Sequence, residues 1–337
     1  RLLQPLVSAE EAVLVRVTAV IPNWNRQEDL ARVLGDLRAQ SHRLEEVVVV
    51  DNGSTDGSAA MAEAAGARVI RLEANRGFAY AVNRGVEAAG PGWVAVLNND
   101  VRLPVDWLAQ LLAAAGREGA WFASGKLLSA ADPTKIDGAF DLLCRGGCAW
   151  RAGSQRLDSE VWSTPAKIHF VPFTAAIFRR ELFERIGLLD EDFESYLEDV
   201  DFGLRCALQG LSGIYVPQVT ARHVGSATLG RWNPDTVRRI ARNQLLLVAK
   251  HYPPDWPRRY LRQVLVAQLL WGAVAARHGT FLAWVRGKRE GLKLFGRYAR
   301  VAQPDLERIL LRAEEQIRRL QEETGYDLYW RLYFAMI

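Results

Sequence analysis

The sequence predicts an α/β fold in which a mostly parallel sheet carries helices on both faces, followed by a C-terminal helical region. Short β-branched runs alternate with segments whose apolar residues recur at helical spacing. The runs are apolar at consecutive positions, as expected for strands buried on both faces of a parallel sheet. From Asp235 onward the chain shows only helical patterns punctuated by proline. We therefore expect an α/β domain over 1–232 and a basic α-helical region over 233–337.

The expected elements follow one another in a regular order through the first hundred residues. Strands are expected at 13–21, 47–50, 67–72 and 93–97, and helices at 27–40, 57–65 and 79–89. After about residue 120 the rhythm loosens. Strands are expected there at 121–128, 170–178 and 214–216, helices at 180–186 and 198–209, and an irregular excursion at 129–169.

Size and composition are those of a globular protein. The chain has 337 residues, of which 49% are hydrophobic and 24% charged, so it can bury a sizeable core. Three cysteines are too few for a disulfide scaffold and suit a reducing, cytoplasmic compartment. The longest apolar run near the C-terminus, 264–276, is too short for a bilayer span, which needs about 20 residues.

The charge is distributed unevenly. Residues 238–300 hold 14 Lys and Arg but only two acids, Asp255 and Glu290, whereas acids outnumber bases elsewhere. Basic residues beside aliphatic and aromatic ones suit a helix lying on an anionic membrane, at the inner face of the cell membrane. The alternative is a packing or dimerisation region whose polar face is basic. Residues 307–323 fit a surface helix or a homodimer contact.

Polar residues follow the apolar strands of the first half of the chain. They are Pro22, Asn23 and Asn25, then Asp51 and Asn52, then Asn75, Arg76 and Gly77, and finally Asn98, Asn99 and Asp100. In an open parallel sheet, ligands bind at the carboxyl ends of the strands. A cluster of these groups at one edge of the sheet is therefore expected to form the site.

The group Asn98-Asn99-Asp100 suggests a site for a metal and a sugar. Asp100 can bind a divalent cation that neutralises a diphosphate leaving group, and the two amides can hydrogen-bond sugar hydroxyls. Asp51 can accept a hydrogen bond from a pyrimidine N–H or a ribose hydroxyl. The alternatives are an ordinary turn after Leu97 and an Asx-turn leading into the helix after Asp51.

A dense group of acids precedes the last expected helix of the α/β domain. Its members are Glu194, Glu198, Asp199 and Asp201. Neighbouring carboxylates raise each other's pKa, which suits a general base. The alternative is an acidic helix start with a surface pair between Asp201 and Arg205. His223 would be either a structural histidine or a second metal ligand beside Asp100.

Taken together, these stretches resemble glycosyltransferase family 2, which has the GT-A fold. The resemblance runs from about residue 17 to 230 and keeps the family's motif order: VIPNWN (20–25), VVVVDNGSTDGS (47–58), NRGFAYAVNRG (75–85), LNNDV (97–101) and LLDEDFESYLEDVDFGLR (188–205). The LNND form and residues 242–253 are most similar to the bacterial rhamnosyltransferase-like branch.

The resemblance implies an inverting, metal-dependent sugar transfer in cell-surface polysaccharide synthesis. It implies Mg2+ or Mn2+, a dTDP- or UDP-sugar donor with rhamnose as the guessed sugar, and a glycan or lipid-linked acceptor. Asp199, beside Glu198, would be the base, and Asp100 and His223 the metal ligands. The nucleotide-sugar would meet Pro22, Asn25, Asp51, Asn52, Arg76, Gly77, Asn83, Asn98 and Asn99. Many members carry two or three acids at the metal motif, whereas this chain has one.

Other functions are open at this point. The single acid at Asp100 leaves room for a weak or inactive nucleotide-sugar-binding protein. A nucleotidyltransferase of similar fold would carry a Gly-rich loop after the first strand, where residues 22–27 hold no glycine. An NAD enzyme would need G-x-G-x-x-G there. A nucleic-acid-binding module would not explain acids and amides at four strand ends, so no nucleic-acid partner is expected.

Overall fold

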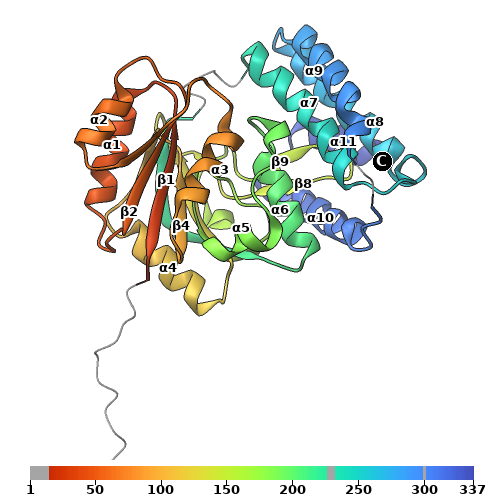
Figure 1. Cartoon of the computed structure of the whole chain (residues 1–337). Helices are drawn as coiled ribbons and strands as arrows, with labels where there is room; N and C mark the ends of the chain where they lie inside the picture. The colour runs from red at the N-terminus through yellow and green to blue at the C-terminus, as the bar shows by residue number, and fades with distance from the viewer. Residues whose placement is uncertain (1–14, 226–231, 299–300) are drawn as a thin grey trace, which may run out of the picture.

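The computed structural model describes residues 15–225, 232–298 and 301–337. Its centre is a ten-stranded sheet with the order β10-β12-β6-β11-β4-β1-β2-β3, in which β5 pairs with β12 and β7 with β6 (Figure 1). The parallel part confirms the predicted alternation of strands and helices. Its strands are β1 (Val17–Asn23), β2 (Glu46–Asp51), β3 (Arg68–Arg71) and β4 (Trp93–Leu97).

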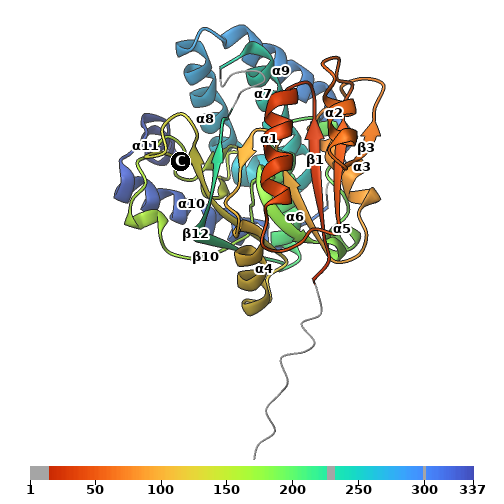
Figure 2. The same ribbon diagram turned by 90° about the vertical axis from the view of Figure 1, so that its left-hand side faces the viewer.

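Helices cover both faces of this part of the sheet, as the apolar runs predict. The helices are α1 (Gln27–Arg38), α2 (Ser58–Ala64), α3 (Phe78–Ala88) and α4 (Trp107–Arg117). Ala19 and Ile21 of β1 share a core with Leu30 of α1 and Leu111 of α4. Val20, which points to the other face, packs with α3. Figure 2 shows α1 in front of the sheet.

The second half of the sheet departs from the predicted strands in length. The strands are β5 (Val101–Arg102), β6 (Phe122–Ser129), β11 (Ala175–Arg179) and β12 (Gly213–His223). β11 is shorter than the predicted 170–178 strand and runs antiparallel to its neighbours β4 and β6. β12 extends to His223 because its register along β6 shifts between Val216 and Thr220. Such an irregularity re-aims the end of a strand, and here it lets His223 pair with Val101, next to Asp100.

The expected irregular excursion contains four short strands, each of three residues, which is too short for a periodic signal. They are β7 (Ile136–Gly138), β8 (Asp141–Leu143), β9 (Ala149–Arg151) and β10 (Ala166–Ile168). β8 and β9 form a separate two-stranded sheet. The remaining helices before residue 225 are η1 (Glu160–Trp162), α5 (Arg180–Ile186), η2 (Glu191–Phe193) and α6 (Glu198–Leu208).

The C-terminal region is helical, as predicted, and gathers on one side of the molecule, away from α1 and α2 (Figure 1). Its helices are α7 (Pro234–His251), α8 (Trp256–Arg277), α9 (Phe281–Leu294), η3 (Phe295–Arg297), α10 (Leu306–Thr324) and α11 (Leu328–Met336). α7 begins close to the predicted boundary, with Pro234 at its start and the Asn233 side chain accepting a hydrogen bond from the backbone N–H of Asp235.

This helical region shares its core with the α/β part. Phe193 and Leu204 lie in one buried cluster with Leu246 of α7 and Leu310 of α10. The apolar face of α10, including Ile317, is buried within the same chain. The charged face of α10 stays exposed, as in the predicted surface helix, and the homodimer contact remains a prediction. None of the described helices is long and apolar enough to cross a bilayer.

Candidate active site

The end of β4 lies against the end of β1, as the parallel sheet requires. The side-chain amide of Asn99 donates to Oδ1 of Asn23 over 2.7 Å. The backbone N–H of Asn98 donates to the carbonyl of Thr174 over 2.8 Å, which fixes the course of the chain after the strand. Asp100 is buried. The three predicted residues therefore stand at the carboxyl edge of the sheet, where ligands bind in such folds.

His223 reaches Asp100 from β12. Its Nε2 lies 3.2 Å from Oδ1 of Asp100, and its Nδ1 lies 2.8 Å from Oδ2 of Asp137 in β7. Burial acts to lower the pKa of His223, but the hydrogen bonds to the two carboxylates outweigh it and raise the pKa to about 9. Asp137 orients the imidazole, in the way that an outer carboxylate commonly orients a metal-binding histidine.

The side chains at His223 can supply only some of the ligands that a divalent cation needs. Among the described residues, no group of three or more His, Cys, Asp and Glu side chains is placed to hold a metal ion. The structure does bring Asp100 and His223 together, with the Asn98 amide 3.4 Å from Nε2 of the imidazole. Carboxylate, imidazole and amide oxygen are ligands that Mn2+ accepts. The phosphates of a donor would have to supply the remaining positions.

The loops after β1 and β2 hold each other in place. The backbone N–H of Asn25 donates to Oγ of Ser54 over 2.7 Å, and Oδ1 of Asn25 accepts from the backbone N–H of Thr55 over 2.9 Å. Asn25 has a φ of 56°, a left-handed conformation that asparagine tolerates. Pro22, the residue before Asn23, is half-buried in β1.

Asp51 carries the clearest unmet hydrogen-bonding capacity at this edge. The residue is buried, and within the described part of the chain its Oδ1 has no hydrogen-bond partner. Such atoms are rare in native proteins because an unpaired buried polar atom costs about 1–3 kcal/mol. A ligand N–H or hydroxyl at Oδ1 would remove that cost.

Asn52 shapes the next loop. Its Nδ2 donates to Oδ1 of Asn75 and to the carbonyl of Gly77, both over 3.1 Å, and its Oδ1 accepts from the backbone N–H of Arg76 over 2.8 Å. Both ends of the amide are therefore engaged within the protein. This geometry lets Asn52 position the loop that carries Arg76, and the direct ligand contact predicted for it stays a prediction.

Asn83 is engaged inside the protein, and its predicted contact with the nucleotide-sugar stays a prediction. The residue is buried, and its Nδ2 donates to the carbonyl of Leu189 and to Oε1 of Glu191. Its Oδ1 accepts from the backbone N–H of Leu189 over 2.9 Å. Asn83 therefore fastens α3 to the segment before η2.

A pocket of about 530 Å³ opens beside the loop that carries Arg76. The Arg76 guanidinium lies over the ring of Tyr80, 4.7 Å from its centroid, and Trp24 is partly exposed. The lining residues are Trp24, Asn75, Arg76, Gly77, Tyr80, Glu191, Glu194 and Arg239. Aromatic faces and cations together suit the nucleobase and the phosphate groups of a nucleotide. Sequence reasoning missed Trp24, Tyr80 and Arg239, although the exposed aromatic in VIPNWN was a usable signal.

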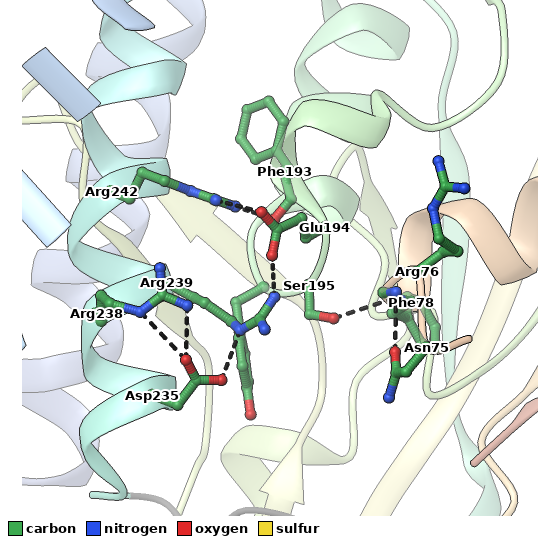
Figure 3. A network of polar contacts seen from close by, with 12 residues as sticks. Asn75, Arg76, Phe78, Phe193, Glu194, Ser195, Asp235, Arg238, Arg239 and Arg242 are labelled. Atoms are coloured by element: carbon green, nitrogen blue, oxygen red, sulfur yellow. Dashed lines mark hydrogen bonds and ion pairs between the residues drawn. The ribbon is translucent and has the colours of Figure 1, made fainter. Parts of the chain in front are cut away.

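The C-terminal helix α7 supports this pocket from the other side. Figure 3 shows Glu194 held by Arg239 and Arg242 of α7, and Ser195 pointing to the start of α3. The backbone N–H of Phe78 donates to Oγ of Ser195 over 3.1 Å. This bond satisfies one of the open N–H groups at the start of α3, so α7 indirectly fixes the loop that carries Arg76.

Asp199, the predicted base, lies in the first turn of α6 and is buried. Its Oδ2 accepts from Nη2 of Arg151 over 3.2 Å, and Arg151 also binds Asp141 through two hydrogen bonds of 3.1 Å. Burial and then the charge of Asp141 raise the pKa of Asp199 to about 7, against the opposing charge of Arg151. Burial and the charge of Asp199 raise the pKa of Glu198 well above its usual range.

Asp201 corrects the surface pair predicted from its spacing to Arg205. Asp201 is fully buried and binds Lys250 and His251 of α7 in addition to Arg205. Burial acts to raise its pKa, but the charges of Arg205 and Lys250 and the hydrogen bond with His251 hold the pKa far below its usual range. Asp201 therefore joins α6 to α7 as a structural anion.

Residues 129–169, which the sequence predicts to be irregular, connect the Asp100–His223 pair with Asp199. Asp137 contacts His223 on the metal side, and Asp141 contacts Arg151 on the base side. The stem of Arg151 passes directly over Gly138, since a Cβ there would lie 2.5 Å from its Cδ. Asp137, Asp141 and Arg151 are thus site-supporting residues that the sequence pattern did not reveal.

Comparison with known proteins gives a consistent result. The family described as Glycosyl transferase family 2 matches residues 18–187. The chain is 30% identical over 228 residues to an N-acetylglucosaminyl-diphospho-decaprenol L-rhamnosyltransferase of Mycobacterium tuberculosis (strain ATCC 25618 / H37Rv), covering 60% of this chain and 74% of the relative. It is 29% identical over 224 residues to the O-antigen biosynthesis protein RfbC of Myxococcus xanthus, covering 63% of this chain and 18% of that protein.

Solved structures with the same fold include metal complexes. A mannosyltransferase from Pyrobaculum calidifontis in complex with GDP-Man and Mn2+ has a TM-score of 0.52 at 17% identity, over 96% of this chain and 87% of the other. GalNAc-T7 with UDP, GalNAc and Mn2+ has a TM-score of 0.58 at 15% identity, over 84% and 58%. At these identities the likeness establishes the fold, which is the predicted GT-A fold.

Proposed function

Because the chain belongs to glycosyltransferase family 2, as a member of its rhamnosyltransferase-like branch, we propose that it moves a sugar from a nucleotide-diphosphate donor to an acceptor hydroxyl with inversion at the anomeric carbon. The observation that carries this proposal is the buried Asp199 carboxyl, whose pKa is raised to about 7 by burial and the charge of Asp141. A general base works best when its pKa lies near the working pH.

The reaction is a single displacement. Asp199 takes the proton of the acceptor hydroxyl as the acceptor oxygen bonds to the anomeric carbon of the donor. The bond from that carbon to the phosphate oxygen breaks, and the nucleoside diphosphate leaves with the electron pair. Attack opposite to the leaving group inverts the configuration. Arg151 orients the Asp199 carboxylate.

Asp100 and His223 would hold Mg2+ or Mn2+ together with the donor phosphates, and Asn98 stands next to them. The ion would neutralise the charge that develops on the departing diphosphate. Two proteins of the same fold were crystallised with Mn2+, which supports a divalent ion here. Because the metal motif has a single acid, the alternative function is that of a weak or inactive nucleotide-sugar-binding protein.

The nucleoside end of the donor would meet Asp51 and Arg76. Oδ1 of Asp51 has no partner among the described residues and can accept from a pyrimidine N–H or a ribose hydroxyl. The pocket with the partly exposed Trp24 provides an aromatic face for stacking. These features favour a dTDP- or UDP-sugar, and Pro22 and Asn25 shape the wall on the side of β1.

The sugar and the acceptor are proposed by analogy with the mycobacterial relative. Its name describes rhamnose transfer to a lipid-linked N-acetylglucosaminyl diphosphate. We extend to this chain a rhamnosyl donor and a lipid-linked glycan acceptor in cell-surface polysaccharide synthesis. The reaction would take place in the cytoplasm, at the inner face of the membrane.

The test is a panel of sugar nucleotides screened for thermal stabilisation of the protein with Mn2+, followed by transfer with the best donor. We expect a dTDP- or UDP-sugar to stabilise most, and the product linkage, read by NMR coupling constants, to be inverted relative to the donor. A retained linkage would contradict the single displacement. If the protein bound the donor but neither transferred nor hydrolysed its sugar, with or without EDTA, the inactive nucleotide-sugar-binding protein would be favoured.

A further inference from the structure

The outer face of α8 exposes a line of leucines. Leu261, Leu265 and Leu269 recur every four residues and therefore lie along one side of the helix. Their exposed fractions are 42%, 51% and 62%. The opposite side of α8, with Tyr260, Val264 and Ala267, is buried in the protein. The exposed leucines are thus additional to the face that packs the core.

A second apolar line lies on the neighbouring helix α11. Leu328, Leu332 and Met336 also recur every four residues, with exposed fractions of 63%, 39% and 46%. Two hydrogen bonds join the helices, from Nε of Arg262 to the carbonyl of Met336 over 2.7 Å and from the Tyr329 hydroxyl to the carbonyl of Ala267 over 3.2 Å. The pairing of 262 with 336 and of 267 with 329 means that α8 and α11 run antiparallel, side by side.

Cations without acidic partners accompany these lines. Residues 238–300 contain two acids, and both form ion pairs: Asp255 with Arg259 and Glu290 with Arg238. Arg259 also pairs with Glu307. Within the described residues, no ion pair is formed by the other exposed cations of α8 and α9. These are Arg258, Arg262, Arg277, Arg286, Arg289 and Lys293.

We propose that the outer face of α8 and α11, with the leucines named above and the α8 cations Arg258 and Arg262, docks on an anionic lipid bilayer, with the helices lying in the plane of the headgroups. The cations require an anionic partner, and an anionic leaflet supplies one together with an apolar layer for the leucines. A second copy of the chain would set the same cations against each other, which is unfavourable. The inference rests on the proposed function in one respect: a lipid-linked acceptor would be presented at that surface.

The experiment is flotation of the protein with vesicles of phosphatidylcholine alone and of phosphatidylcholine with phosphatidylglycerol. We expect flotation only with the anionic vesicles, decreasing as salt rises because surface charges are screened. Leu265→Ser with Leu269→Ser, and separately Arg258→Glu with Arg262→Glu, should each reduce bound protein by roughly tenfold. Val105→Ser is the matched control, because Val105 is an exposed apolar residue in the connection before α4 and should float like the unaltered protein.

Several outcomes would overturn the proposal. One is that the protein fails to float with anionic vesicles, and another is that the variant with both leucines replaced floats as well as the unaltered protein. Equal flotation with both kinds of vesicle would also contradict the proposal. A light-scattering mass that drops to that of a monomer in the leucine variant, without vesicle binding by the unaltered chain, would identify a second copy as the partner instead. Donor-induced thermal stabilisation, measured without lipid, should be unchanged in every variant. If the donor did not stabilise the unaltered protein, this would count against the proposed function, whereas the membrane result would stand.

Discussion

Arg151 donates a hydrogen bond from Nη2 to Oδ2 of Asp199, across 3.2 Å. The same guanidinium binds Asp141 through two bonds, so the positive charge is shared between two carboxylates. This sharing keeps Arg151 from lowering the pKa of Asp199 as far as a dedicated partner would. Burial then dominates, and the pKa of Asp199 rises to about 7.

Replacing Asp199 by Asn should remove transfer while leaving the donor bound. The amide keeps the shape of the side chain but cannot take a proton, so we expect kcat to fall by about 10²–10⁴-fold. Steady-state transfer and calorimetric titration of the donor with Mn2+ measure the two effects separately. Equal loss of transfer and of donor affinity would instead assign Asp199 a binding or structural role.

The pH dependence of the rate should report the carboxyl of Asp199. A base must be deprotonated to act, so kcat should rise with pH through about 7, the pKa to which burial and the charge of Asp141 raise Asp199. In Asp141→Asn the neighbouring negative charge is gone, and the acid limb should move to lower pH. Asp158→Asn is the matched control, since Asp158 in the same excursion binds Lys126 instead. An acid limb that stays in place in Asp141→Asn would contradict the assignment.

Asp100→Asn should weaken the metal-dependent part of donor binding. The substitution removes the one carboxylate of the metal motif, and we expect donor affinity in Mn2+ to fall by about tenfold or more. In EDTA the variant and the unaltered protein should bind alike. Asp106→Asn, a nearby acid that contacts Gln110, should leave both affinities unchanged. If Asp100→Asn behaved like that control, the metal would have to be held elsewhere.

The sequence predicts the ligand edge of the sheet well because continuous apolar strands end there in recognisable polar motifs. It does not reveal that Asn83 is buried and bonded to Leu189, because a helical NRG motif does not show which side of α3 faces the core. It misses Asp137, Asp141 and Arg151 because three-residue strands have no periodicity. The pairing of His223 with Asp100 depends on a register shift in β12 that no local pattern announces. The spacing of Asp201 to Arg205 indicates only one of its partners, since Lys250 and His251 lie 49 and 50 residues further along the chain, in α7.

Asp201→Ala should destabilise the whole chain. The change leaves Lys250 and His251 without their buried anion, and breaking such a group typically costs about 3–5 kcal/mol, measured by denaturant unfolding. Asp305→Ala, which breaks an exposed pair with Arg308, should cost at most about 1 kcal/mol. The folded-state pKa of Asp201 is depressed, because the cations around it outweigh its burial. Its stabilisation is therefore present above about pH 4, the pKa of an unfolded aspartate, and is lost as the pH falls below that value. Equal unfolding free energies for the two variants would disprove this role.

Gly77→Ala tests whether the loop that carries Arg76 is fixed by its contact with the segment before α6. Gly77 has a φ of 91°, and a Cβ there would lie 2.8 Å from the carbonyl oxygen of Glu194. The loop must therefore move, which should displace Arg76 and weaken donor binding. Gly66→Ala is the matched control, because Gly66 also has a positive φ, of 81°, but nothing lies within 4 Å of its Cβ position. Both variants should lose about 1 kcal/mol of folding free energy to backbone strain, whereas only Gly77→Ala should lose donor affinity in calorimetry. Equal donor affinity in the two variants would show that the contact with Glu194 does not position the loop.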